Sequence, residues 1–253
     1  MTTSTPCPSD GLTARGRRDG FGAQYSAMVS VFVYAARSNR TYCATPWTTM
    51  QHGVNASRMF RFIGGAAFGP RATDATPAMA DAHARGIFPE RRDAASLAFR
   101  REIRRFYDAA PKLPLAWFRS TPSCAGHKQI AVHVRRGDIG DGRSEAAPSE
   151  ILGCVAALRA RHPCSTVHVM SEGNATALQY LGDVRLHVNE DVEQTFHHMV
   201  HADALLVASS TFSGIASFLS RGEAWACGGR GRLVSAPVGG PYARTNPWYW
   251  VRR

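Results

Sequence analysis

The second half of the chain alternates strand-like and helix-like segments, and this alternation limits the fold more than any other feature. Four apolar segments with β character are each followed by a segment with helical periodicity. The strands are expected at 129–134, 166–170, 184–188 and 204–208, and the helices at 148–162, 174–181, 191–201 and 212–219. Repeated strand–helix units form parallel sheets with right-handed crossovers. The sequence therefore predicts a Rossmann-like α/β domain.

The first half is less regular. A glycine-rich turn at 19–22 precedes an expected helix at 24–37, and short β character appears at 41–44. A segment rich in Gly, Ala and Pro at 64–89 reads as a linker, and a basic amphipathic helix is expected at 91–107. Residues 11–18 are too polar for a strand. We therefore expect a flexible N-terminus (1–18), a reduced N-terminal domain (19–125) and a Rossmann-like domain (126–253).

Composition excludes several classes of protein. Hydrophobic residues make up 44% and charged residues 19% of the 253, which is enough to form a core and excludes global disorder. No apolar stretch approaches the length of a transmembrane helix, and the first ten residues lack a signal-peptide pattern. The net charge of +11 comes almost entirely from arginine, which suits anionic ligands. The arginines are scattered without interleaved aromatics, so a solvated basic surface is favoured over nucleic-acid binding.

The cysteine and asparagine residues indicate in which cellular compartment the protein resides. The six cysteines form no Cys-x-x-Cys pair, so a structural zinc site is not expected, and up to three disulfides are allowed. Three of the five asparagines, Asn39, Asn55 and Asn174, open an Asn-x-Ser/Thr sequon. The sequons favour the lumen of the secretory pathway or Golgi. The missing signal pattern leaves a cytoplasmic location as the alternative.

Polar segments follow three of the predicted strands, at 133–138, 171–173 and 209–214. In an open parallel sheet, ligands bind outside the carboxyl ends of the strands, so these segments meet at one rim if their strands are neighbours. Arg135 and Arg136 would neutralise a diphosphate there, and the hydroxyls and N–H groups opening the last helix would hold it. Asp203, just before the last strand, would accept hydrogen bonds from a purine. The sequence predicts a nucleotide-diphosphate site.

Each signal also has a plainer interpretation. Adjacent arginines at a strand end are usually surface ion-pair partners, and Ser or Thr before a helix is usually an N-cap. The tripeptide 136–138 matches an integrin-binding sequence but is poorly displayed between a strand and a helix. His197, His198 and His201 have metal-like spacing, but no glutamate accompanies them, so helix-surface histidines are favoured.

A family resemblance joins these segments. IAVHVRRGD at 130–138 resembles the HxRRxD motif of the metal-independent fucosyltransferase superfamily, which includes the α1,2, α1,6 and protein-O types. The segment at 201–220 is similar to that superfamily's last motif, and VHVMSEGNATALQYL is similar to its middle segment. GFGAQ at 20–24 is similar to the glycine turn that opens its first domain. The likeness covers about 128–222, and the first half only at that turn.

The resemblance implies a GT-B-like architecture of two Rossmann-like domains with parallel sheets, the N-terminal one reduced, and a GDP-fucose donor bound mainly by the second. It implies that Arg135 is the essential residue that holds the donor diphosphate. Further donor-binding roles fall on His133, Arg136, Asp138, Glu172, Asp203, Ser210 and Ser213, and an acceptor-side loop on Gly20, Gly22 and Gln24. Three features depart from the pattern: Ala23 replaces a frequent asparagine, the first strand of the acceptor-side domain is missing, and the chain is short for two full domains.

These features favour an inverting glycosyltransferase that transfers fucose from GDP-fucose to a glycan or protein hydroxyl. Neither a cofactor nor a metal is expected, because no Asp-x-Asp metal motif occurs and arginine would supply the charge stabilisation. Glu172, Asp141 and Glu145 are the candidate general bases. The alternatives are a degenerate module that binds the nucleotide sugar without transfer, and an arginine-rich nucleic-acid-binding protein.

Overall fold

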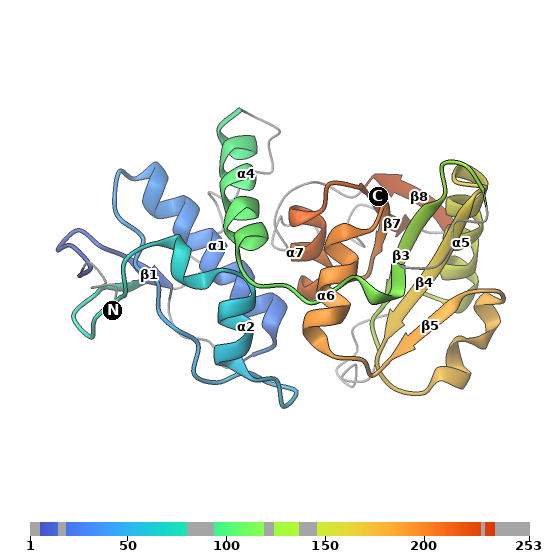
Figure 1. Ribbon diagram of the computed structural model, residues 1–253, viewed down its shortest axis with the longest axis horizontal. Coiled ribbons are helices and arrows are strands. Elements are labelled where there is room, and N and C mark those ends of the chain that lie inside the picture. Colours follow the sequence, from blue (N-terminus) through green and yellow to red (C-terminus); the bar gives the residue numbers. More distant parts are fainter. Residues whose placement is uncertain are drawn as a thin grey trace. The chain divides into compact units, whose positions relative to one another are not determined.

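The computed structural model describes residues 6–14, 19–79, 94–118, 124–136, 146–228 and 231–235, and it divides into two compact units (Figure 1). One unit consists mainly of Met1–Lys112 and the other mainly of Leu113–Val238. Within the described ranges, no helix combines the length and apolarity that a membrane crossing requires.

The second unit is built on a six-stranded sheet in the order β5-β4-β3-β6-β7-β8. Neighbouring strands are parallel except for the antiparallel pair β7–β8. The predicted α/β class with a parallel sheet is confirmed, and the four predicted strands agree with the structure to within a residue or two at their ends. Two further strands, β7 and β8, were not predicted. The strands are β3 (Lys128–Val134), β4 (Ser165–Ser171), β5 (Arg185–Val188), β6 (Ala204–Val207), β7 (Glu223–Gly228) and β8 (Arg232–Ser235).

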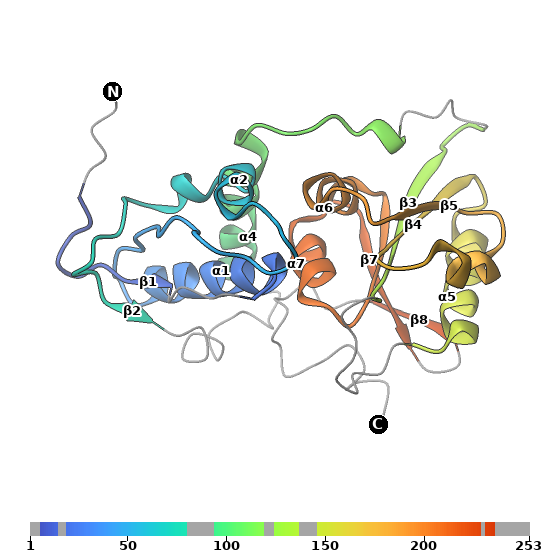
Figure 2. The same ribbon diagram turned by 90° about the horizontal axis from the view of Figure 1, so that it is seen from below.

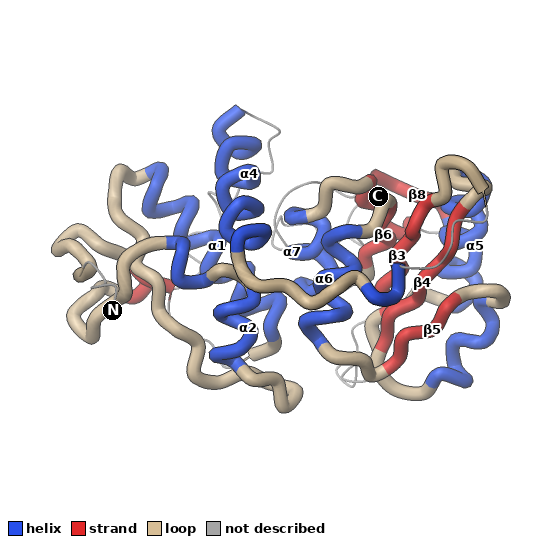
Figure 3. Tube along the Cα trace, in the orientation of Figure 1, coloured by secondary structure: helices blue, strands red, loops and turns tan. Residues whose placement is uncertain are grey.

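Helices cover both faces of this sheet (Figures 2 and 3). Helix α5 (Pro148–Arg161) and the 3-10 helix η4 (Ala175–Leu181) lie on one face, and α6 (Val192–His201) and α7 (Thr211–Leu219) lie on the other. Under α5, alternate residues of the central strands form a buried core with Ile130, Val132, Val167, Val169, Leu158 and Leu178 as members. Because side chains alternate across a strand, the residues between these point toward α6 and α7.

Local sequence signals fix the helix starts as expected. Pro148 occupies the first turn of α5, where its missing N–H costs nothing. Asp191 precedes α6, and its Oδ1 accepts hydrogen bonds from the backbone N of Glu193 and Gln194, at 2.9 and 3.1 Å. Strand β6 is buried on both faces, as its continuous apolar sequence predicted.

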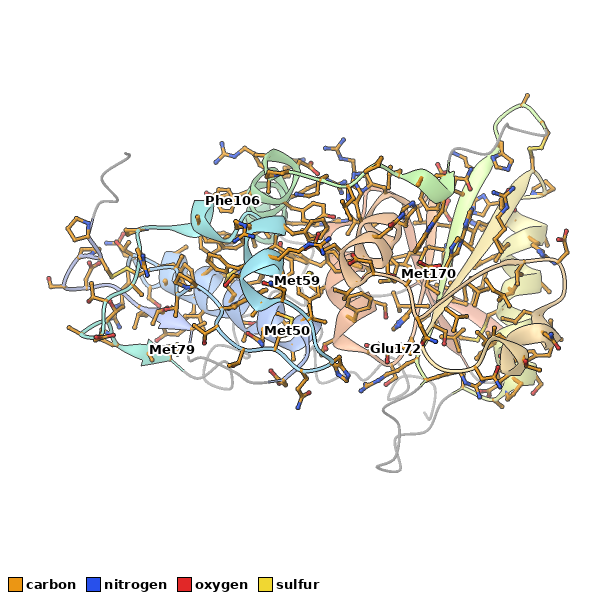
Figure 4. The ribbon with its side chains drawn as sticks, turned by 60° about the horizontal axis from the view of Figure 1, so that its bottom comes forward. Met50, Met59, Met79, Phe106, Met170 and Glu172 are labelled. Atoms are coloured by element: carbon orange, nitrogen blue, oxygen red, sulfur yellow. A yellow bond between two sulfur atoms is a disulfide. The ribbon has the colours of Figure 1, made fainter. Side chains whose placement is uncertain are left out.

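The first unit is mainly helical, with α1 (Phe21–Arg37), α2 (Ala56–Phe62), η1 (Gly65–Phe68) and α4 (Ala94–Ala109). An aromatic cluster holds these elements together. Phe32 packs edge-on against Phe68 and Phe106, with ring centroids 5.2 and 6.0 Å apart, and Phe62 packs in the same way on Tyr107 at 5.6 Å. Phe106 is labelled in Figure 4. Edge-to-face aromatic pairs of this kind stabilise a core beyond simple area burial.

Two short strands in the first unit correct the sequence analysis. β1 (Thr13–Ala14) lies before the glycine turn, where no strand was predicted, and it pairs in parallel with β2 (Ala78–Met79), inside the predicted linker. Two-residue strands carry too little periodicity to be recognised. Helix α2 was likewise not predicted. Segment 41–44 makes only isolated bridges, through Tyr42 and Ala44.

All six cysteines are paired in disulfides. Cys7 bonds Cys43 in the first unit, whereas Cys124–Cys164 and Cys154–Cys227 lie in the second. The last pair links α5 to β7 across the sheet core. The sequence allowed three disulfides, and the structure forms three.

Candidate functional site

The three polar segments predicted to share a rim belong to adjacent strands. β3 is central, β4 pairs with it on one side and β6 on the other, and all three run in parallel. Arg135 follows β3, Glu172 follows β4 and Ser209–Ser210 follow β6. The condition under which these segments meet at one carboxyl-end rim is therefore met.

The strand order reverses between β3 and β6. From β3 the chain continues to β4 and β5 on one side, and then returns to β6 and β7 on the other. Open parallel sheets bind their ligands at this point, because the two outgoing connections leave a crevice between them. Here the switch point lies between the segment that carries Arg135 and the start of α7.

Arg135 joins the two sides of this switch point. Its Nη1 donates a hydrogen bond to the backbone O of Ser209, 3.3 Å away, and the side chain is half-buried. A guanidinium carries five N–H donors, and this contact uses one of them and orients the group. The bond places the arginine beside the N-terminus of α7.

Arg136 is directed elsewhere. Its Nη1 donates to the backbone O of Ala177 in η4, at 3.3 Å. Consecutive residues at the end of a strand point to opposite faces, so Arg135 extends toward α7 while Arg136 extends toward η4. The predicted pairing of the two guanidinium groups on one diphosphate is not the arrangement found. Of these two arginines, Arg135 is the one that lies at the switch point.

The start of α7 is shaped by its serines. Ser210 is the N-cap, and its Oγ accepts a hydrogen bond from the backbone N of Phe212 at 3.2 Å. The Phe212 ring packs edge-on against His133 of β3, with centroids 5.6 Å apart, so α7 and β3 are in direct contact on this face. A helix N-terminus presents N–H groups and a positive dipole end, both favourable to an anion.

Ser213 does not present its hydroxyl to a ligand. The side chain is fully buried, and its Oγ accepts from the backbone N of Ala208 at 3.1 Å and lies 3.4 Å from the O of the same residue. The predicted phosphate contact of this hydroxyl is therefore wrong. Ser213 instead closes the turn between β6 and α7, which holds Ser210 in place.

Glu172 lies exposed at the end of β4, next to Ser171, and it is labelled with Met170 in Figure 4. Ser171 donates through Oγ to the backbone O of Val134 at 2.7 Å, which fastens this loop to the residue before Arg135. Of the other candidate acids, Asp138, Asp141 and Glu145 lie outside the described residues.

Asn189 was missed by the sequence analysis. It follows β5 with φ of 58° and bonds twice to Gly173, accepting from its N at 2.8 Å and donating to its O at 3.0 Å, while its own N donates to the O of Ser171. Asparagine tolerates this left-handed conformation better than most residues, and an asparagine directly after a predicted strand was the available signal. It clamps the loop that carries Glu172.

Asp203 lies at the wrong edge of the sheet for the predicted contact with a purine. It precedes β6, and its Oδ2 accepts from the backbone N of Gln129 at 2.8 Å while Oδ1 pairs with Lys128 at 3.1 Å. Lys128 begins β3 and Arg135 follows its end, so the two edges are about 20 Å apart at 3.3 Å per residue. The structure assigns Asp203 to fastening the amino ends of β3 and β6.

We accordingly expect Asp203→Ala to lower stability by about 1 kcal/mol, since it removes a charge-assisted hydrogen bond and a surface ion pair of little worth. Nucleotide affinity should be unchanged. Urea unfolding and calorimetric titration with GDP measure the two effects. Lys128→Gln is the matched control, because it removes only the ion pair. Loss of GDP affinity in Asp203→Ala alone would contradict this placement.

A histidine network lies on the sheet face under α6, below the rim. His198 donates through Nδ1 to the O of Gln194 at 2.8 Å, so its Nε2 must accept from the backbone N of Trp117 at 3.1 Å. The Trp117 ring stacks on both His198 and His187, with centroids 4.2 and 3.9 Å apart. His197 and His198 are both buried, so their predicted place on the helix surface is wrong, whereas His201 is exposed as expected. The network holds the segment 116–118 against this unit.

The same network keeps its histidines neutral. His168 bonds His187 at 2.9 Å through Nδ1 and Gln129 at 2.8 Å through Nε2. Burial, with His187 and Arg185 nearby, lowers the pKa of His168 to about 3, and burial beside His198 and Arg185 lowers the pKa of His187 to about 4. Burial also lowers the pKa of His198. Among the described residues, no group of three His, Cys, Asp or Glu side chains has the geometry to hold a metal ion.

Acid should therefore destabilise the second unit. The unfolded chain binds protons below pH 6.5, while folded His168 and His187 stay neutral until about pH 4, so stability is complete above 6.5 and falls as the pH drops toward 4. Each such histidine adds a slope approaching about 1.4 kcal/mol per pH unit. Urea unfolding at pH 7, 6 and 5 measures it. His187→Phe keeps a ring beside Trp117 and should flatten the slope; an unchanged slope would contradict the assignment.

The predicted acceptor-side residues lie at the start of α1. Gly20 is the N-cap of this helix, and Gly22 lies in its first turn. Gln24 is buried, and its Nε2 donates to the backbone O of Asp19 and of Thr49, at 3.0 and 2.8 Å. Both amide hydrogens thus fasten the glycine turn to a second loop of the same unit. An acceptor contact by these residues stays a prediction.

Comparison with known proteins shows which solved structures have a similar fold. The chain matches no protein-family profile and no curated protein sequence. It is similar in structure to the fucosyltransferase NodZ from Bradyrhizobium, with a TM-score of 0.52 and 16% identity over 92% of this chain and 100% of that one. NodZ alpha-1,6-fucosyltransferase soaked with GDP-fucose aligns with a TM-score of 0.49 and 15% identity, over 91% of this chain and 100% of that one. The fold is GT-B-like, as predicted, and at this identity the similarity concerns the fold alone.

Proposed function

We propose that the chain is an inverting, metal-independent glycosyltransferase that transfers fucose from GDP-fucose to a hydroxyl of a glycan or a protein. The observation that carries this proposal is the contact between Arg135 and Ser209 at the topological switch point. It sets a guanidinium beside a helix N-terminus, where an open parallel sheet binds its ligand. Both groups favour a diphosphate.

In this reaction, Arg135 and the N-terminus of α7 would stabilise the leaving group. The acceptor hydroxyl attacks the anomeric carbon from the face opposite the nucleotide, the bond from that carbon to the diphosphate oxygen breaks, and GDP leaves with additional negative charge. Fixed donors aimed at that charge lower the barrier because they need no reorganisation during the reaction. Arg135 and the N-terminus of α7 would supply them. Glu172 is exposed at the same rim and is the described candidate for taking the acceptor's proton.

Two further facts support the donor assignment. The fold is similar to that of a fucosyltransferase, although at 16% identity this likeness concerns the fold alone. The residues at the rim also belong to the segments whose sequence resembles the fucosyltransferase motifs: HVRR at 133–136, SEG at 171–173 and SSTFS at 209–213. A shared fold hosts many activities, so the argument depends on the rim residues.

Donor hydrolysis with and without EDTA tests the proposal. We expect slow release of GDP from GDP-fucose, unchanged by EDTA, because arginine and helix N–H groups replace a metal. GDP should inhibit this release, and a screen of glycan and glycoprotein acceptors should accelerate it. A strict requirement for Mn²⁺ or Mg²⁺ would contradict metal independence and point to another class of transferase.

The same titrations separate the alternatives. Tight GDP-fucose binding without turnover, for any acceptor, would replace the transferase by a nucleotide-sugar-binding module. RNA affinity that falls steeply with salt, with no binding of GDP-fucose, would favour the arginine-rich surface as a nucleic-acid site.

We further propose that the protein resides in the lumen of the secretory pathway or Golgi. Its three disulfides support this location, because disulfides persist in oxidising compartments and are rare in the cytosol. Thiol labelling of protein from intact cells tests it. Three oxidised pairs are expected, and six free thiols would favour the cytosol.

A further inference from the structure

The three sequon asparagines all lie on exposed turns. Asn39 follows α1 with φ of 52°, Asn55 is the N-cap of α2, and Asn174 is the N-cap of η4. Each of the three residues is exposed. An oligosaccharide attached to any of them would therefore extend into solvent without displacing the core.

The amide groups of two of them are oriented for modification. The Oδ1 of Asn55 accepts from the backbone N of Arg58, and the Oδ1 of Asn174 accepts from the backbone N of Thr176, each at 2.9 Å. The second bond is an Asx-turn that brings the sequon threonine beside its asparagine. Both caps use the carbonyl oxygen of the amide and not its nitrogen. Attachment of a sugar to Nδ2 would leave both caps intact.

We propose that Asn39, Asn55 and Asn174 are N-glycosylation sites. The co-reactant is an oligosaccharide linked to a lipid diphosphate. A bond forms between the asparagine Nδ2 and the anomeric carbon of the first sugar, the bond from that carbon to the diphosphate oxygen breaks, the lipid diphosphate leaves, and the amide loses one proton. This proposal rests on the secretory location and is independent of the transferase activity.

Two independent observations support this proposal. The sequons are features of the sequence alone, whereas the three disulfides are features of the fold that require an oxidising compartment. N-glycans are attached in that same compartment. In the cytosol, by contrast, thiols are kept reduced and the six cysteines would not stay paired.

Mass spectrometry of the protein isolated from its own cells tests the sites. Treatment with peptide-N-glycosidase in H₂¹⁸O converts each glycosylated asparagine into ¹⁸O-labelled aspartate. Labelled peptides are expected for all three positions. A position recovered only as unlabelled asparagine overturns the proposal for that position, and three unlabelled positions overturn it entirely.

Matched variants separate the glycan from the cap when the full chain is secreted from cultured eukaryotic cells. Ser57→Ala and Thr176→Ala leave Asn55 and Asn174 in place but remove the sequon, and each should lose one glycan's mass on a gel. Asn55→Asp also blocks attachment while keeping a side-chain oxygen for the N-cap, so its Tm should match that of the enzymatically deglycosylated protein. A gel mass that does not change in any variant would contradict the proposal.

Discussion

An Arg135→Ala variant is expected to lose donor turnover by about 10²-fold or more while keeping its fold. Arg135 is the side chain that the structure places at the switch point, beside the N-terminus of α7. Its removal takes away a fixed positive group from the place where GDP would leave. The hydrogen bond from Arg135 to the Ser209 carbonyl is a small part of the stability of this unit. GDP-fucose hydrolysis, followed with circular dichroism and thermal unfolding, measures both effects.

Two neighbouring variants calibrate this result. Arg135→Lys keeps the charge but loses the planar fork, so it should recover only part of the activity. Arg136→Ala removes the adjacent guanidinium, which bonds Ala177 on the other face, and should cost much less. Turnover near the wild-type level in Arg135→Ala would make this arginine a surface residue and would remove the proposed mechanism.

The sheet could be predicted because its central strands are long and apolar. β3 and β4 have seven residues each, and each is followed by a helix whose start carries a recognisable cap or proline. The two strands that were not predicted, β7 and β8, lack these signals. β7 contains two alanines and a terminal glycine. β8 has four residues, of which three are exposed and only Leu233 is partly buried. Neither therefore presents the alternation of a long strand.

The site could be predicted only in outline. The segments after β3, β4 and β6 meet at one rim because these strands are parallel neighbours. This arrangement could be predicted from the sequence. The direction of single side chains did not follow. Ser213 and Ser210 have the same chemistry, yet one turns inward to Ala208 and the other caps α7. Adjacent arginines diverge because the strand alternates its faces. Asp203 was an avoidable error, since a residue that precedes a parallel strand lies at the edge away from the ligand.

Removal of the Cys154–Cys227 disulfide is expected to destabilise the second unit by about 4 kcal/mol, or about 10³-fold in its folding equilibrium. The bond closes a loop with a sequence separation of 73, and the chain-entropy relation gives this magnitude for a loop of that length. Both cysteines are buried, and they link α5 to β7. The double variant Cys154→Ala/Cys227→Ala tests it, with hydrogen exchange of the β3 and β6 backbone amides as the measurement, because these amides report this unit.

The disulfide between Cys7 and Cys43 provides the matched control. It closes a loop with a separation of 36, for which the same relation again gives about 4 kcal/mol, but it lies in the first unit. Cys7→Ala/Cys43→Ala should therefore accelerate exchange in α1 and leave β3 and β6 protected. Reduction of the unmutated chain breaks all three disulfides without creating a cavity. Comparison with the alanine variants therefore separates the effect of loop entropy from the effect of lost packing. If β3 and β6 keep full protection in Cys154→Ala/Cys227→Ala, the sheet is held by its apolar core and the disulfide contributes little.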